Sequence, residues 1–241
     1  MKTIGNYKEK LVLGMLSNVP FDGLQWEALY RAAEDLKIYK TPLTNENKIE
    51  LKNLFENNLV NIIKAFNDYL DDKMEEQYLK YKKMKKRTPE KIKSLILSRF
   101  SASLNFKDGI LSSLSFMSLP QNSKSSLKML YNTCDRIWRV SGDQSTDFSF
   151  YTKRLILSGV YSSTLMHWIN DDSGDLKKTE DFLDRRLENV SKIGKVKQIG
   201  LKFKDLNLDK KSFPFKILSS IPKTFESKNF ENIISKFKNF K

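Results

Sequence analysis

The stretch GDQSTDFSFYTKR, residues 142–154, predicts the point at which a loop becomes a helix. Ser145 or Thr146 can cap such a helix, and Asp147 in its first turn complements the positive end of the helix dipole. Two sets of residues then fall on different faces of the helix, namely Phe148, Tyr151 and Leu155 at helical spacing, and Phe150, Lys153 and Arg154 elsewhere. The stretch therefore indicates a helical fold, and its mixture of rings and charges fits either an ordinary helix start or a binding surface.

Helical periodicity continues through the rest of the chain, and no segment alternates convincingly as a strand would. We expect Pro20 and Gly23 to end the first helix, and one long helix to carry an apolar stripe from Phe55 to Tyr69. Besides that long helix, the predicted elements are helices at 5–17 and 24–37, a helix from Thr88 through Phe100, a short apolar element at 110–116, and helices at 123–140, 146–169 and 175–198. The sequence predicts an all-α protein.

The 241 residues are enough for one moderately large domain or one domain with a tail, and the net charge of +14 is unevenly placed. Residues 191–241 hold 13 Lys and 4 acidic residues, a net charge of +9, whereas residues 1–190 hold 30 basic and 25 acidic residues, a net charge of +5. The single cysteine, Cys134, excludes an intramolecular disulfide and fits a buried small hydrophobe in a reducing compartment. The sequence has no apolar run of membrane-spanning length and no leader pattern. We therefore expect a bacterial cytoplasmic protein, or a mature form without its targeting segment.

Several kinds of catalytic site lack the residues that they need. The single His167 cannot build a ferritin-type di-iron site, and one Cys with one His cannot build a Cys/His zinc site. The sequence contains no Walker A loop and no dinucleotide-binding glycine pattern. His167 lies near Asp171 and Asp172, which leaves a cryptic Ser-His-Asp enzyme as an alternative, but nothing resembles a nucleophile elbow and Asp171–Gly174 fits a helix stop and turn. We expect a non-catalytic protein without cofactor or metal.

Apolar side chains that the helices direct inward can line a pocket for a long hydrocarbon, because ligand pockets are mostly apolar. A solid core would use the same residues, so the sequence leaves both possibilities open. The lipid-binding candidates are Leu114, Phe116, Leu127, Tyr131, Trp138, Leu155 and Leu165, and further candidates for the lining are Leu95, Phe100 and Ile110.

The C-terminal region combines lysines with an aromatic and apolar stripe, which is the composition of a helix that lies in an anionic membrane interface. The alternatives are a disordered basic tail or a helix docked on the body. The membrane-binding candidates are Phe213, Phe215, Ile217, Leu218 and Ile221 with Lys216 and Lys223, and a second stripe follows at Phe230, Ile233, Ile234 and Phe237.

Four stretches resemble the coenzyme Q biosynthesis lipid-binding accessory family, the ninth Coq protein of mitochondria and its bacterial relatives. They span about residues 10 to 195 and comprise Val19–Gly23 followed by Ala32–Asp35, the 142–154 stretch, Tyr161–Leu165 with Asp171–Ser173, and Thr179–Val190. The resemblance implies a TetR-regulator-like fold, which three short N-terminal helices before a larger helical body also suggest. It further implies binding of isoprenoid lipid and a C-terminal amphipathic membrane helix.

In that family the surface around the 142–154 stretch is implicated in docking the demethoxyubiquinone hydroxylase, and exposed rings flanked by charges are typical of interface hot spots. Three departures suggest a partner surface adapted to another hydroxylase of the ubiquinone pathway, because Phe150 and Leu24 stand where the family usually has Trp and Lys37 stands where it has Gly. The positions that match the docking surface are Asp135, Gly142, Asp147, Phe150, Tyr151 and Arg154.

The residues and the resemblance together predict three regions. These are a degenerate helix-turn-helix-like region at 1–45, a helical lipid-binding body at 46–198 and a basic amphipathic tail at 199–241. We expect a non-catalytic accessory protein that binds an isoprenoid quinone or phospholipid and presents quinone intermediates to the hydroxylase. It should act as a homodimer at the surface of the bacterial inner membrane, or on the matrix side of the mitochondrial membrane in a mature eukaryotic form.

A TetR-like DNA-binding transcription regulator is the alternative from another class. Its helix-turn-helix would place a recognition helix in the major groove. The turn after Lys37 has no glycine, Pro42 interrupts it, and the acidic Glu46 and Glu50 follow where a basic helix face is needed. The basic surplus also lies at the other end of the chain. We therefore expect no nucleic-acid partner.

Overall fold

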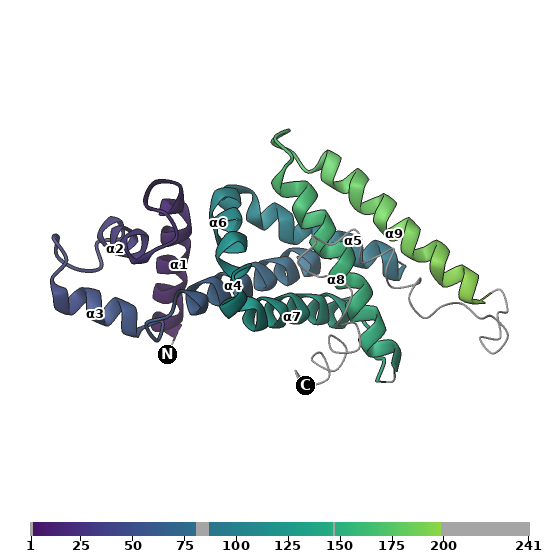
Figure 1. Cartoon of the computed structure of the whole chain (residues 1–241), viewed down its shortest axis with the longest axis horizontal. Helices are drawn as coiled ribbons and strands as arrows, with labels where there is room; N and C mark the ends of the chain where they lie inside the picture. The colour runs from purple at the N-terminus through teal and green to yellow at the C-terminus, as the bar shows by residue number, and fades with distance from the viewer. Residues whose placement is uncertain (1, 81–86, 147, 199–241) are drawn as a thin grey trace. The chain divides into compact units, whose positions relative to one another are not determined.

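The computed structural model describes residues 2–80, 87–146 and 148–198, which form α-helices, short 3-10 helices and connecting loops (Figure 1). Within these residues there is no strand, which confirms the predicted all-α class. The α-helices are α1 (Lys2–Asp22), α2 (Trp26–Asp35), α3 (Asn45–Asn53), α4 (Leu59–Lys80), α5 (Thr88–Ser103), α6 (Lys107–Met117), α7 (Ser123–Ser141), α8 (Phe148–Ile169) and α9 (Lys177–Gln198), and the 3-10 helices are η1 (Leu104–Phe106) and η2 (Pro120–Asn122).

The chain divides into two compact units, and α5 and α7 each contribute to both. The first unit comprises Met1–Tyr81 and Ser98–Met129, and the second comprises Lys82–Leu97 and Leu130–Lys241. The predicted boundaries after residues 45 and 198 stay predictions.

The core of the first unit forms because α1 and α2 bury matching apolar faces. Leu11, Met15 and Leu16 of α1 and Leu29 of α2 are at most 1% exposed. α2 contributes small residues at helical spacing, Ala28, Ala32 and Ala33, so the two helices can pack closely. A buried ion pair joins α4 to α5 in the same unit, with Arg99 Nε 2.7 Å from Asp71 Oδ1.

The expected end of the first helix at Pro20 is wrong, because α1 continues through Pro20 to Asp22. Proline removes one backbone hydrogen bond, here the bond to the carbonyl of Leu16. α6 approaches this carbonyl so closely that a Cβ at Gly109 would lie 2.9 Å from its oxygen. Gly23, with φ +72°, does end the helix as expected.

The single long helix expected around Phe55 is also wrong, because α3 and α4 are separate helices. Glu56 and Asn57 lie between them with φ of 55° and 51°, in the left-handed region. Asn tolerates this conformation, but Glu gives no sequence signal for it. Phe55 and Phe66 nevertheless lie in the core at 1% and 3% exposure, so the apolar stripe was correctly identified across the break.

The three C-terminal helices of the described chain, α7, α8 and α9, agree with the predicted 123–140, 146–169 and 175–198 within two residues at each end. In the second unit α8 packs against α9. Its core includes Ile137, Leu157 and Leu183. Cys134 is fully buried among them, which confirms the prediction of a small core hydrophobe.

Candidate functional site

The candidate site begins where α7 ends, at a turn that depends on Gly142. The N–H of Gly142 donates to the carbonyl of Arg139 and the N–H of Asp143 donates to the carbonyl of Trp138, both at 3.0 Å. This bond pair is a Schellman motif, in which the residue after the helix adopts a positive φ. Gly142 has φ +96°, which side-chain-bearing residues rarely adopt. The motif therefore fixes the direction in which Asp143 leaves the helix.

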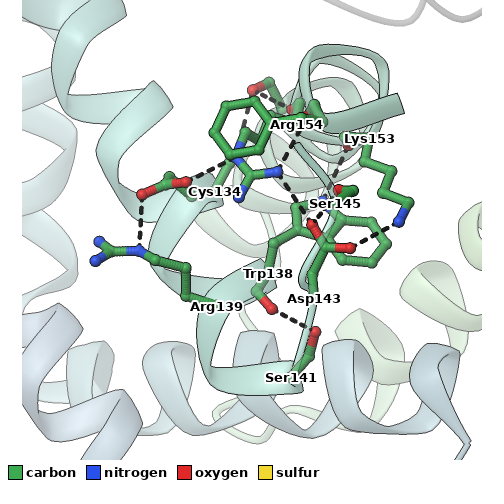
Figure 2. Close-up of polar contacts among 11 residues, drawn as sticks. Cys134, Trp138, Arg139, Ser141, Asp143, Ser145, Lys153 and Arg154 are labelled. Carbon is green, nitrogen blue, oxygen red and sulfur yellow. Dashed lines mark hydrogen bonds and ion pairs between the residues drawn. The ribbon is translucent and has the colours of Figure 1, made fainter. Parts of the chain in front are cut away.

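The carboxylate of Asp143 collects three donors from the loop and from α8 (Figure 2). Oδ1 accepts from Lys153 Nζ at 2.6 Å, while Oδ2 accepts from Ser145 Oγ at 2.7 Å and from Arg154 Nη1 at 3.2 Å. Its side chain is only 6% exposed. Burial alone would raise the pKa of Asp143, but the three hydrogen bonds outweigh it and hold the pKa below its ordinary value. Asp143 is therefore a buried carboxylate that stays ionised at neutral pH.

Arg154 is the largest fully buried side chain of the described residues, at 1% exposure. Its guanidinium lies between two carboxylates, with Nε donating to Asp135 Oδ1 at 2.7 Å and Nη1 donating to Asp143 Oδ2. Asp135 also accepts from the exposed Arg139, whose Nε lies 2.8 Å from Oδ2. A buried arginine needs this degree of pairing, because desolvation costs several kcal/mol per ion.

Two half-buried rings lie next to this ion network. The ring centroid of Phe150 is 3.4 Å from Cζ of Arg154, and Nη1 of Arg154 also donates to the carbonyl of Phe150 at 3.0 Å. The ring of Tyr151 meets that of Phe150 edge to face, with centroids 5.1 Å apart. Arg154 therefore holds both the backbone and the ring of Phe150, and Phe150 in turn contacts Tyr151.

The indole of Trp138 joins the end of α7 to α8. Its Nε1 donates to the carbonyl of Lys153 at 3.0 Å, and the Lys153 ammonium lies 5.5 Å from the ring centroid. Lys91 of α5 donates to the carbonyl of Ser141 at 3.1 Å, where a cation complements the negative end of the helix dipole.

The structure brings together most of the predicted docking residues, namely Asp135, Gly142, Phe150, Tyr151 and Arg154, at the junction of α7 and α8. Asp147 lies outside the described residues. Arg154 is buried and paired, so a partner can reach the half-buried rings together with Gly142, Lys153 and the exposed Arg139. Sequence reasoning missed Asp143 as the centre of the cluster, since no spacing rule connects residues 143 and 154.

The predicted lipid-lining residues are divided between the two units. Leu114, Phe116 and Leu127 belong to the first unit, and Tyr131, Trp138, Leu155 and Leu165 belong to the second. Tyr131 is buried, which raises the pKa of its hydroxyl, whereas the other six are partly exposed. Leu95 and Phe100 are fully buried. The lining role of these residues stays a prediction, and the membrane-binding candidates at 213–223 lie outside the described residues.

His167 packs flat on Phe182 of α9, with ring centroids 4.4 Å apart and the planes at 8°. Its Nε2 is buried without a hydrogen-bond partner. Asp171 accepts from the hydroxyl and the N–H of Ser173, and these bonds lower its pKa. α8 ends at Ile169, as expected for a helix stop and turn. In the described part of the chain no group of three His, Cys, Asp or Glu could hold a metal ion. No described helix is long and apolar enough to cross a membrane.

Two lysines of α3 lie over aromatic rings of α2. Lys48 lies 5.4 Å from the ring centroid of Tyr30, and Lys52 lies 5.6 Å from that of Trp26, so these two α3 cations turn back onto α2. Lys37 follows the C-cap of α2 and has φ +53°, in the left-handed region.

Residues 123–194 match the sequence model of the COQ9 family. The chain is 34% identical over 110 residues to the "Ubiquinone biosynthesis protein COQ9, mitochondrial" of Rattus norvegicus, which covers 46% of this chain and 35% of the relative. It is 35% identical over 116 residues to the COQ9-A protein of Xenopus laevis, covering 48% and 37%, and 25% identical over 122 residues to the coq9 protein of Schizosaccharomyces pombe, covering 51% and 49%. The matched segment thus spans about a third to a half of the length of these relatives.

Proposed function

We propose that this chain, whose residues 123–194 match the COQ9 family model, acts in ubiquinone biosynthesis as a non-catalytic accessory protein of that family. It binds isoprenoid quinone intermediates or neighbouring lipid and presents them to a membrane-associated ring hydroxylase. The demethoxyubiquinone hydroxylase, or another hydroxylase of the pathway, is the partner. The observation that carries the proposal is the cluster at the α7–α8 junction, which lies inside the matched segment.

The cluster supports docking because it holds accessible rings in one geometry. Binding is stronger when the contacting side chains are ordered beforehand, since the entropic cost of ordering them falls. Here the ring of Phe150 rests on a guanidinium that two carboxylates hold, and Tyr151 rests on Phe150. Aromatic residues with a charged surround are the usual anchors of interfaces.

Delivery of the quinone follows from differential burial. The isoprenoid tail leaves the bilayer for an apolar space between helices, which is about as apolar as the lipid, so the exchange needs little net free energy. The polar head is released at the mouth to the hydroxylase. The apolar stripe and lysines at 213–223 hold the protein reversibly on the membrane, because each lysine near an anionic surface contributes about 1 kcal/mol.

The proposal includes a TetR-like arrangement and a homodimer at the inner-membrane surface or the mitochondrial matrix side. The names of the relatives from Rattus norvegicus and Xenopus laevis include the word mitochondrial, in keeping with this location. A DNA-binding regulator is the competing function, and it requires cations on α3. The turning back of Lys48 and Lys52 onto α2 argues against it.

Two measurements test the proposal. Native mass spectrometry of the detergent-free chain, followed by organic extraction, should recover an isoprenoid quinone or its precursor. An empty protein that still binds membranes would refute the carrier role and leave a scaffold that recruits the hydroxylase. DNA affinity that falls steeply with salt would instead favour the regulator.

Docking is tested with Phe150→Ala and Tyr151→Ala against the purified hydroxylase. Each variant should raise the dissociation constant for the hydroxylase at least tenfold. Each should also keep the bound lipid, because these rings lie on the docking surface and not at the lipid site. Phe21→Ala is the matched control, since Phe21 is a 79% exposed ring in the first unit. Equal binding by Phe150→Ala and Phe21→Ala would show that the hydroxylase docks elsewhere.

A further inference from the structure

Asp143 is the shared hydrogen-bond acceptor of the α7–α8 cluster, although its side chain is almost fully buried. Its carboxylate is 6% exposed and receives donors from Ser145, Lys153 and Arg154. A partner cannot make substantial contact with such a group. Any effect of Asp143 on binding must therefore pass through another side chain.

A continuous set of contacts leads from Asp143 to the accessible rings. Asp143 Oδ2 accepts from Arg154 Nη1 at 3.2 Å, and the same Nη1 donates to the carbonyl of Phe150. The guanidinium packs against the ring of Phe150, with Cζ of Arg154 3.4 Å from the ring centroid, and the ring of Tyr151 meets that of Phe150 edge to face. Each step joins groups in direct contact, so the orientation of the guanidinium sets the position of both rings.

Asp143 supplies the orienting force that Asp135 alone cannot supply. Asp135 contacts Arg154 through Nε and shares its second oxygen with Arg139, so one side of the guanidinium depends on Asp143. Charge-assisted bonds to two carboxylates fix the plane of the guanidinium. Without Asp143 only the bonds from Nε to Asp135 and from Nη1 to the carbonyl of Phe150 remain, and the latter is to an uncharged acceptor. The turn at Gly142 and the bond from Ser145 fix Asp143 itself.

We propose that Asp143 is a positioning residue of the docking surface: acting through Arg154, it sets the orientation in which Phe150 and Tyr151 meet the partner. This inference rests on the proposed function, since it assigns the determinant of that same surface. Asp143→Asn keeps the shape of the side chain and removes its charge. It should leave the rings present but incorrectly oriented.

The first experiment measures the ring directly and needs no partner. 4-Fluorophenylalanine is placed at position 150 of the full chain, and its ¹⁹F resonance is compared in the wild-type and Asp143→Asn backgrounds. The resonance should shift or broaden in the variant, because the ring leaves the fixed guanidinium. 4-Fluorophenylalanine at Phe182, which packs on His167 in the same unit, should keep its resonance. An unchanged resonance at 150, or equal changes at both positions, overturns the inference.

The second experiment is a double-mutant cycle on binding to purified demethoxyubiquinone hydroxylase in nanodiscs. In the wild-type background, Asp143→Asn should raise the dissociation constant about tenfold, which is a loss of about 1.4 kcal/mol of binding free energy. In the Phe150→Ala background it should raise the dissociation constant less than twofold. A merely structural or independent role gives the same loss in both backgrounds and overturns the inference. Asp71→Asn, which breaks the buried pair with Arg99 in the first unit, is the matched control and should leave binding unchanged.

The two experiments separate this inference from the function on which it rests. If the wild-type chain does not bind the hydroxylase, the proposed docking function fails, while the fluorine resonance still decides whether Asp143 positions the ring. If the wild-type chain binds and Asp143→Asn binds equally well, the docking function stands and the positioning role is refuted.

Discussion

Replacement of the buried Arg154 by Met tests whether the ion network holds the second unit together. Met fills a similar elongated space and removes the charge, together with the bonds to Asp135, Asp143 and the carbonyl of Phe150. All three bonds involve the charged guanidinium, and hydrogen bonds to charged groups contribute about 1.5–3 kcal/mol each, so the gross loss is about 4.5–9 kcal/mol.

Two effects reduce that loss. The variant no longer has to desolvate a guanidinium, which costs several kcal/mol. Both carboxylates also keep another donor, since Asp143 retains Lys153 and Ser145 and Asp135 retains Arg139. We therefore expect Arg154→Met to lower the free energy of unfolding by about 3 kcal/mol, which corresponds to a fall in Tm of about 6–12 °C for a chain of this length.

Arg139→Met is the matched control for this prediction. Arg139 binds the same Asp135, but its side chain is 65% exposed, and exposed ion pairs contribute about 0–1 kcal/mol. Urea unfolding followed by circular dichroism at 222 nm should give similar free energies of unfolding for wild type and Arg139→Met, and a clearly lower one for Arg154→Met. If the two variants lose the same stability, or if Arg154→Met stays within about 0.5 kcal/mol of wild type, the buried ion network does not stabilise the second unit.

Three further predictions follow from particular backbone and titration features. Lys37→Gly should stabilise the chain by about 1 kcal/mol in urea unfolding, because Lys37 adopts a φ of +53°, whereas Lys40→Gly, outside the left-handed region, should not. Gly142→Ala should destabilise by about 1 kcal/mol or more and lower the affinity for the hydroxylase, because Ala is strained at φ +96°; equal stability would contradict the assigned turn. The pKa of Asp143 is lowered in the folded state, so its stabilising contribution is present above the ordinary pKa of about 3.9 and is lost as the pH falls through the lowered value. Urea unfolding at a series of pH values should therefore show a shallower loss of stability below about pH 4 in Asp143→Asn than in wild type, and parallel curves would contradict the assigned ionisation.

Helix boundaries could be predicted where the sequence marks both the apolar face and the stop. α7, α8 and α9 combine a clear stripe with Gly142 or the Asp171–Gly174 turn, and their limits were predicted within two residues. The boundary between α3 and α4 has a stripe that continues across it and a Glu in the left-handed conformation. Periodicity describes which residues are buried, so it identified Phe55 as core but could not locate the break.

The candidate site was predictable as a location but not as an arrangement. The mixture of rings and charges at 142–154 indicated the segment that contributes Asp143 and Arg154 to the ion network, and the Asp135–Arg139 spacing of four is a familiar helical pair. The bonds that define the site join Arg154 to residues 11 and 19 positions earlier, across a turn. Such contacts depend on how α7 and α8 pack, and a single sequence carries no local rule for them.

The burial of Arg154 also explains why one short segment carries so many charges beside its rings. A ring that must stay accessible cannot be fixed by burial in the core, so a buried group that contacts its inner face has to orient it. A guanidinium suits this task, because its flat face supports an aromatic ring while its edge binds carboxylates. Phe150 keeps its ring on that face, at 3.4 Å from Cζ, and lacks the indole N–H that the Trp expected from the resemblance would offer. On the proposed docking function, the anchoring of the ring therefore persists while the hydrogen-bonding groups offered to a partner differ, which would suit a different hydroxylase.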